Sequence, residues 1–339
     1  MLLKKSVLYY MPIVYAHVSG GLGNQLFIIF SCIATALRDK ADFIIEGTYD
    51  SNSIIDETHA RKTYWNTPMF EKVKKYAKNV SYYDIQYITI FNEKLNYDII
   101  TLPNTNDCVK KSLRLMGYLQ CPMFFDKYVR EITSMLCIDE LQEKQQQRFP
   151  KIQSNTCAMH FRLGDYKEQQ YRHPIMPLEY YKNALEYMLE KTNKKLHILW
   201  CCHNPDKKEV QEEYITKLSI MYPEITFQEL PSSNSEYEEL LLMSFCDHFI
   251  ISNSTFSWWS AYLCKNQNKI VCYPETWFGH SVNNTITNEE NRKRMFPLAW
   301  KEITFNITIP DLPKQFKTTR TRTRTRTRTR TSARTRFTQ

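Results

Sequence analysis

The placement of glycine constrains the fold of this chain most, because only seven glycines occur among its 339 residues. Three of them lie within the segment Gly-Gly-Leu-Gly at residues 20–23. An apolar run at 13–18 predicts a strand before this segment, and apolar residues at helical spacing predict a helix over 24–38. A strand, a glycine turn and a helix form the first unit of a doubly wound α/β domain, whose turn can bind a ligand. A tight turn without function is the alternative interpretation.

A second group of residues lies near the end of a strand predicted over 156–163. Side-chain alternation places His160 and Arg162 on one face and Leu163 on the opposite face, toward the core. Ligands bind at the carboxyl ends of strands in open α/β sheets, and arginine presents a planar fork of donors that suits phosphate. A structural ion pair between Arg162 and the nearby Asp165 is the alternative.

A third feature is a turn of hydroxyl-rich residues at 252–255, between a predicted strand at 249–251 and an apolar helix at 256–264. The hydroxyls of Ser254 and Thr255, together with the first amides of the helix, can form an anion site. The simpler alternative is a well-capped core helix with two packing tryptophans. Helices are also predicted at 178–191 and 206–222, and strands at 196–201 and 269–274. This alternation of strands and helices predicts a nucleotide-binding α/β domain.

The net charge of +9 belongs to the end of the chain. Residues 317–339 hold one Lys and eight Arg, and removing these 9 from the 45 basic residues leaves 36, equal to the 36 Asp and Glu. A neutral body disfavours specific nucleic-acid binding. The tail alternates Thr with Arg and is predicted to be disordered. It is either a tolerated repeat expansion or a segment that binds an anionic surface such as a membrane.

Length and cysteine use indicate two domains with free thiols. The predicted division is an N-terminal domain at 1–148, a C-terminal domain at 149–316 and the tail at 317–339. Ten cysteines without a C-x-x-C pair predict reduced, buried thiols. No apolar stretch reaches 18 residues, so no membrane span is expected.

Three ordered motifs resemble those of the α-1,2-fucosyltransferases: Gly-Gly-Leu-Gly-Asn-Gln-Leu-Phe at 20–27, His-Phe-Arg-Leu-Gly-Asp-Tyr at 160–166, and Ser-Asn-Ser-Thr-Phe-Ser-Trp-Trp at 252–259. The resemblance implies a GT-B fold, in which two Rossmann-like α/β domains face a central cleft. It implies inverting transfer of L-fucose from GDP-fucose to the 2-hydroxyl of a galactose-terminated glycan. No cofactor and no metal are expected, since the chain contains no D-x-D motif.

The resemblance also implies roles for individual residues. Arg162 matches the essential phosphate-binding arginine, and Asn24 matches the asparagine that reaches the diphosphate and the sugar. Glu239 falls where related enzymes place a carboxylate against guanine. The remaining donor-binding residues are Gly21, Gly23, His160, Ser254, Thr255 and Phe256. Asp165 and Glu168 are the candidates for the general base.

The resemblance leaves alternatives open. The family commonly has a second arginine where this chain has Leu163, a loss we expect to be tolerated at a core-facing position. A fucosyltransferase of another regiospecificity, or another GDP-sugar transferase, fits the same donor motifs. A non-catalytic glycan or nucleotide binder with a polybasic tail is a further alternative. Because the glycine motif lies so near the start, a cytoplasmic enzyme of bacterial or viral type is expected, with membrane association through the tail as an option.

Overall fold

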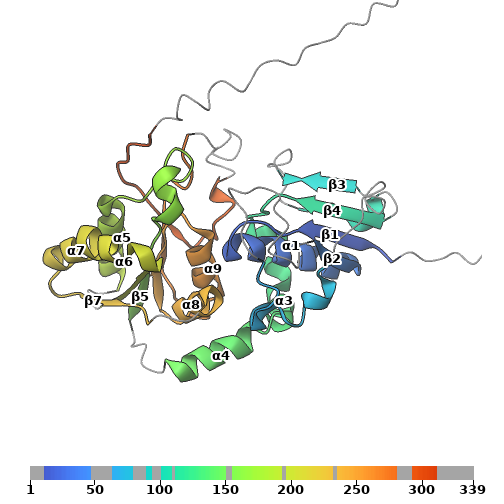
Figure 1. Ribbon diagram of the computed structural model, residues 1–339, viewed down its shortest axis with the longest axis horizontal. Helices are drawn as coiled ribbons and strands as arrows, with labels where there is room; N and C mark the ends of the chain where they lie inside the picture. The colour runs from blue at the N-terminus through green and yellow to red at the C-terminus, as the bar shows by residue number, and fades with distance from the viewer. Residues whose placement is uncertain are drawn as a thin grey trace, which may run out of the picture.

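A computed structural model describes residues 11–46, 63–78, 89–93, 101–108, 111–149, 155–192, 196–231, 235–280 and 292–310. These residues form two α/β domains, each built on a parallel sheet (Figure 1). The predicted GT-B architecture of two Rossmann-like domains is thereby confirmed. The tail at 317–339 lies outside the described residues.

The first domain is built on a four-stranded parallel sheet of order β2-β1-β4-β3. Its strands are β1 (Ile13–His17), β2 (Asp42–Glu46), β3 (Thr89–Asn92) and β4 (Ser112–Met116). Helix α1 (Leu22–Asp39) follows β1 and packs its apolar residues on Val14 and Ala16, which are fully buried. The predicted strand, glycine turn and helix are therefore present.

The second domain is built on a six-stranded parallel sheet of order β10-β9-β8-β5-β6-β7. Its strands are β5 (Thr156–Phe161), β6 (His197–Cys202), β7 (Thr226–Glu229), β8 (His248–Ile250), β9 (Val271–Pro274) and β10 (Lys301–Ile303). In Figure 1, α5 (Leu178–Lys191), α6 (Lys207–Val210) and α7 (Thr216–Met221) lie on the side of this sheet away from the first domain. Helices α8 (Glu236–Met243) and α9 (Thr255–Leu263) lie on the side toward it.

One predicted helix is interrupted. The expected helix at 206–222 consists of α6, a π-helical turn at Gln211–Ile215 and α7. A π turn takes in one additional residue, a change that hydrophobic spacing alone does not reveal.

Short 3-10 turns lie at Pro68–Phe70, Lys74–Tyr76, Thr105–Asp107, Pro122–Phe124, Asp126–Tyr128, Gly164–Glu168 and Asn204–Asp206.

Two helices connect the domains, α3 (Val129–Met135) and α4 (Ile138–Arg148). In α4 the buried Gln142 donates from Nε2 to Ser244 Oγ at 2.8 Å and to the carbonyl oxygen of Leu263 at 3.2 Å. Both acceptors belong to the second domain. The connecting helix is therefore bonded to the domain that follows it.

The largest hydrophobic core runs through both domains. Phe27 of α1 lies 4.5 Å from Trp258 and 4.9 Å from Trp259 of α9, measured between ring centroids. Both tryptophans are fully buried, which confirms the packing role predicted for them. A second core occupies the opposite face of the six-stranded sheet and includes Leu163. The length of the chain predicts two domains, and the structure shows that the larger of the two cores is shared between them.

The cysteine prediction is confirmed. All ten cysteines are free, and eight of them are buried. Within the described residues, no helix combines the length and the apolar character needed to cross a bilayer.

Candidate functional site

The N-termini of α1 and α9 meet where the two domains touch (Figure 1). Gly23 is the point of contact, because a Cβ atom there would lie 2.5 Å from the carbonyl carbon of Thr255 and 2.7 Å from the Phe256 nitrogen. Trp259 Nε1 donates to the Gly23 carbonyl oxygen at 2.8 Å. The close approach that this glycine permits is therefore between two protein backbones.

The other glycines of the loop differ from Gly23. Gly20 has a φ of +75°, and a Cβ on it would lie 2.6 Å from Asn24 Nδ2. Gly21 is the N-cap of α1, and a Cβ there would meet nothing within 4 Å. Gly21 thus leaves open space at the start of the helix.

Asn24 links the two helices. Its Oδ1 accepts hydrogen bonds from Thr255 Oγ1 at 3.0 Å and from Gln120 Nε2 at 2.9 Å. Thr255 belongs to the second domain, and Gln120 follows β4 of the first. The sequence predicts Asn24 and Thr255 as site residues, and the structure brings them into direct contact.

The two helix ends create a positive region. Neither α1 nor α9 has an acidic residue in its first turn. The N-cap of α1 is Gly21, which has no side chain, and the Ser254 side chain at the N-cap of α9 makes no capping hydrogen bond. A helix N-terminus carries about half a positive charge, so two such ends side by side repel each other unless an anion lies between them. The arrangement is therefore suited to binding an anion.

His160 supports the turn at the start of α9. Its Nδ1 lies 2.8 Å from Ser252 Oγ and 3.0 Å from Ser257 Oγ, and its ring lies 5.6 Å from that of Phe256. Burial, together with the nearby charge of Arg162, lowers the pKa of His160 to about 3. The imidazole is therefore neutral at physiological pH, and it positions the hydroxyl turn without contributing charge.

Arg162 lies beside this turn. Its Nη2 donates to Asp165 Oδ1, and its guanidinium lies 5.0 Å from the centre of the Tyr166 ring. Tyr166 in turn donates from its hydroxyl to the Asn253 carbonyl oxygen at 3.1 Å, which connects the arginine loop to the hydroxyl turn. The ion pair between Arg162 and Asp165 that the sequence offers as an alternative is present. It uses one corner of the guanidinium, whose side chain remains 25% exposed.

The two neighbours of this motif that the sequence singles out lie in different surroundings. Leu163 is 2% exposed and packs in the second core, so the predicted core-facing position is confirmed. Glu168 is exposed at the end of a 3-10 turn.

Asp206 is a residue that the sequence does not single out. It is 3% exposed, and its Oδ2 accepts from the Gly164 nitrogen at 2.8 Å while its Oδ1 accepts from Lys167 Nζ at 3.0 Å. Gly164 has a φ of +45°, a conformation that side chains disfavour. Asp206 therefore fixes the loop that carries Arg162. The only sequence feature that could have identified Asp206 as part of the site is its position just after the carboxyl end of β6.

Glu239 lies half-buried in the first turn of α8. Burial raises the pKa of its carboxyl group, and the nearby Lys207 opposes that rise. Among the described residues, no group donates a hydrogen bond to its carboxylate. A partly desolvated carboxylate in this state suits a ligand with N–H donors.

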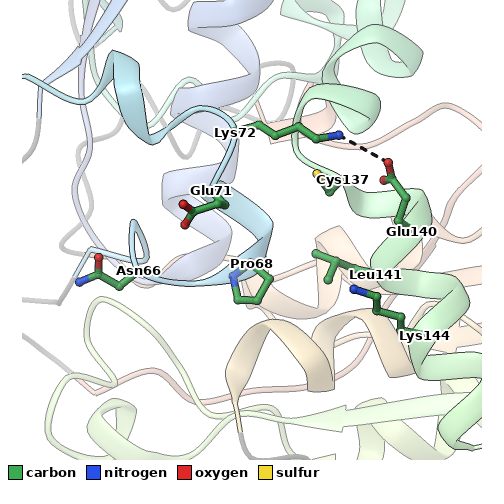
Figure 2. Close-up of a pocket in the computed structure, with 8 residues that line it drawn as sticks. All are labelled: Asn66, Pro68, Glu71, Lys72, Cys137, Glu140, Leu141 and Lys144. Carbon is green, nitrogen blue, oxygen red and sulfur yellow. Dashed lines mark ion pairs between the residues drawn. The ribbon is translucent and has the colours of Figure 1, made fainter.

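A cavity of about 470 Å³ lies elsewhere, between the turn at Pro68–Phe70 and α4 (Figure 2). It is lined by Asn66, Pro68, Glu71, Lys72, Cys137, Glu140, Leu141 and Lys144. Lys72 Nζ and Glu140 Oε1 pair across it at 3.5 Å. None of the predicted site residues lines this cavity.

Two α/β domains on parallel sheets, with helix N-termini that meet between them, form an architecture typical of nucleotide-binding proteins. The model of glycosyl transferase family 11 matches residues 107–296, more than half of the chain. The chain belongs to glycosyltransferase family 11, and it is a glycosyltransferase.

The chain is similar to two curated glycosyltransferases, and a solved fucosyltransferase structure aligns with it. The chain is 24% identical over 310 residues to the O-antigen biosynthesis glycosyltransferase WbnK of Escherichia coli, covering 80% of this chain and 97% of WbnK. It is 25% identical over 297 residues to an α-1,2-colitosyltransferase of Escherichia coli, covering 81% of this chain and 96% of that protein. The fucosyltransferase NodZ from Bradyrhizobium aligns with a TM-score of 0.40 and 12% identity, over 75% of this chain and 92% of NodZ.

Proposed function

We propose that this glycosyltransferase moves L-fucose from GDP-β-L-fucose to the 2-hydroxyl of a galactose-terminated glycan, with inversion to an α-1,2 linkage. The observation that carries the proposal is the meeting of two helix N-termini, without a carboxylate in either first turn, beside Arg162. A diphosphate is the anion that a sugar nucleotide would place there. The three sequence motifs and the family membership support the same donor class.

The chemistry follows from the charge that develops during transfer. As the bond between fucose C1 and the β-phosphate oxygen breaks, negative charge grows on the phosphate and the sugar becomes oxocarbenium-like. Arg162, the Ser254 hydroxyl and the first amides of α9 are the proposed donors for that charge, while the Thr255 hydroxyl donates its single proton to Asn24 Oδ1. Such preorganised donors stabilise a transition state without a metal ion. Attack by the acceptor hydroxyl from the opposite face of C1 then inverts the anomeric centre.

Glu239 is the proposed contact for guanine. A carboxylate can accept from both N–H groups on one edge of guanine, whereas adenine presents no such pair. The raised pKa and the lack of a donor among the described residues support this role. The same contact would explain a preference for GDP over other nucleotides.

Asp165 is the proposed proton acceptor for the incoming hydroxyl. Its carboxylate is 42% exposed, so an incoming hydroxyl can reach it. A weak base suffices when the proton leaves late in the reaction. Glu168, exposed on the same turn, is the second candidate.

A second donor deserves a direct test because one relative is an α-1,2-colitosyltransferase. Colitose lacks the 3-hydroxyl of fucose, so the two GDP-sugars differ by one polar group. A site that hydrogen-bonds the 3-hydroxyl rejects colitose strongly, while a site with an apolar wall there discriminates weakly. The ratio of kcat/KM for GDP-fucose and GDP-colitose decides between these donors.

The experiment is a transfer assay with GDP-fucose and a panel of galactose-terminated acceptors, with the product linkage read by NMR. We expect an α-1,2 product and full activity in excess EDTA. A product with another linkage would contradict the proposed α-1,2 regiospecificity. Activity that is lost in EDTA and restored by Mn²⁺ or Mg²⁺ would overturn the metal-free mechanism. A wild-type chain that binds GDP but transfers no sugar to any acceptor would support a binding protein instead.

A further inference from the structure

A chain of hydrogen bonds runs from the end of β3 to Asn24. Glu93, which follows β3, accepts from the Leu119 nitrogen at 2.8 Å through Oε2 and from the Gln120 nitrogen at 3.2 Å through Oε1. Gln120 then donates from Nε2 to Asn24 Oδ1 at 2.9 Å. Glu93 and Gln120 are not among the residues that the sequence motifs predict for the site.

The loop that carries Gln120 has an unusual backbone. Gly117 has a φ of +127°, and a Cβ on it would lie 2.4 Å from Glu93 Oε2. Leu119 has a φ of +54°, which is costly for a leucine and persists only when surrounding contacts hold it. The Glu93 carboxylate supplies two such contacts, and the fully buried Leu119 side chain supplies another. The loop is therefore built to hold Gln120 in one position.

The position of Gln120 determines which way the Asn24 amide faces. A carbonyl oxygen has two lone pairs, and Gln120 together with Thr255 uses both lone pairs of Asn24 Oδ1. The Asn24 amide nitrogen has no acceptor within the described part of the chain. It lies over the glycine loop, 2.6 Å from where a Cβ of Gly20 would be. Two N–H donors are thus presented at the N-terminus of α1.

We propose that Gln120 is a positioning residue that fixes the Asn24 amide with its nitrogen toward the donor diphosphate, and that Glu93 holds Gln120 in place. This inference rests on the proposed function, since it takes the diphosphate as the anion between the N-termini of α1 and α9. It identifies two residues of the first domain that act on the donor through Asn24. Neither of them needs to touch the substrate.

Two substitutions of Gln120 test the orientation of the amide. Gln120→Met is similar in length and neutral but cannot donate, so Asn24 keeps only its bond to Thr255, and kcat should fall about tenfold. Gln120→Glu presents an acceptor, which draws the Asn24 nitrogen toward itself and turns the oxygen toward the phosphate. Its kcat should fall about 10²–10³-fold, as when a charge-stabilising donor is removed. Because the effect is on developing charge, kcat should fall more than KM for GDP-fucose rises.

Glu93→Gln keeps one acceptor oxygen and loses the other, so it should lower kcat by less than Gln120→Met does. Gln142→Met is the matched control for a merely structural glutamine. Gln142 is buried whereas Gln120 is half-buried, and it too bonds across segments, but to Ser244 and Leu263. It should lower the melting temperature while leaving kcat and KM unchanged.

The outcomes separate this inference from the proposed function. An active wild-type enzyme whose Gln120→Met and Gln120→Glu variants keep more than half of kcat would overturn the positioning role alone. A wild-type chain that neither binds GDP by calorimetry nor turns over GDP-fucose would overturn both. If Gln120→Glu fails to fold, the uncharged Gln120→Met decides, and a lower melting temperature with unchanged kcat would reduce Gln120 to a structural residue.

Discussion

The glycine turn at 20–23 and the hydroxyl turn at 252–255 occupy matching places in the two domains, yet they contribute in opposite ways. Each follows a parallel strand and begins a helix, and the two helices meet at their N-termini. On the glycine side, the lack of a side chain at Gly23 lets the backbone of Thr255 approach. On the hydroxyl side, the turn supplies polar groups and is held by His160. The first turn contributes packing to the candidate site, and the second is proposed to contribute hydrogen-bond donors.

The comparison predicts where substitutions act. Changes among the donors of the second domain should reduce activity in a protein that stays folded. Changes at the glycine contact should reduce stability first.

Arg162→Ala should have the largest effect. The arginine is proposed to hold the phosphate on which charge develops, so its loss should lower kcat by about 10²–10³-fold or more. Arg162→Lys should restore little, because a point charge does not reproduce the planar fork. Steady-state kinetics with GDP-fucose measures both variants, with circular dichroism to check folding.

Arg130→Ala serves as the control, since Arg130 is exposed on α3. It should behave as wild type. A folded Arg162→Ala variant that keeps more than about a tenth of wild-type kcat, against the loss expected, would remove Arg162 from the donor set.

Glu239→Gln should weaken GDP binding about 10–100-fold, the range for losing hydrogen bonds to a charged group. In the wild type, burial raises the pKa of the Glu239 carboxyl group. The charged form is the one that accepts from guanine, so GDP affinity should be complete above this raised pKa and decline as the pH falls through it. The variant should lack this pH dependence. Calorimetry with GDP and ADP at several pH values measures both effects.

Glu238→Gln is the matched control on the same helix. Glu238 pairs with Arg148 at 3.6 Å, away from the proposed guanine contact. It should leave GDP affinity unchanged. Equal affinity for GDP and ADP in the wild type would contradict the guanine role of Glu239.

Gly23→Ala tests the packing side. The added Cβ would lie 2.5 Å from the backbone of Thr255, which cannot move aside as a flexible side chain can. Overpacking of this kind costs about 1–3 kcal/mol of unfolding free energy. Gly21→Ala is the control for stability, because its φ is −72° and its Cβ would meet nothing within 4 Å. Urea unfolding of both variants makes the measurement, and equal stabilities would show that the contact is not tight.

Removing the chain after Phe316 should have the smallest effect. The deletion takes away 9 positive charges and leaves all three motifs in place. We expect unchanged kcat on a soluble acceptor. Loss of activity in a truncated protein with an intact fold would make the tail part of the catalytic unit. The roles assigned to the two turns would then not account for activity on their own.

Local patterns in the sequence predict much of the fold. The helix predicted at 178–191 is α5 (Leu178–Lys191). The alternation predicted over 156–163 correctly places Leu163 in the second core, although β5 ends at Phe161. Periodicity of this kind depends only on neighbouring residues. The π turn inside the predicted helix at 206–222 escapes it, because one extra residue shifts the spacing without removing the apolar side chains.

The site is predicted only in part, for a physical reason. Motif positions identify Asn24, Arg162 and Thr255. The supporting contacts join segments far apart in sequence, such as Asp206 with Gly164, 42 residues away, and Gln120 with Asn24, 96 residues away. A single sequence carries no pattern for such pairs. The glycine loop shows a related limit, since its glycines predict a turn that can bind a ligand but not that the backbone of Thr255 lies against Gly23.

The core shared by the two domains has a consequence for modularity. Phe27, Trp258 and Trp259 belong to different domains and yet pack as one cluster, and Gly23 accepts a hydrogen bond from Trp259. In a chimera that joined this second domain to the first domain of a relative, the side chains of the two domains would not be matched where they pack together. Exchange of acceptor specificity by recombination would therefore have to carry α1 and α9 together, or leave both in place and vary only other loops at the carboxyl ends of the strands.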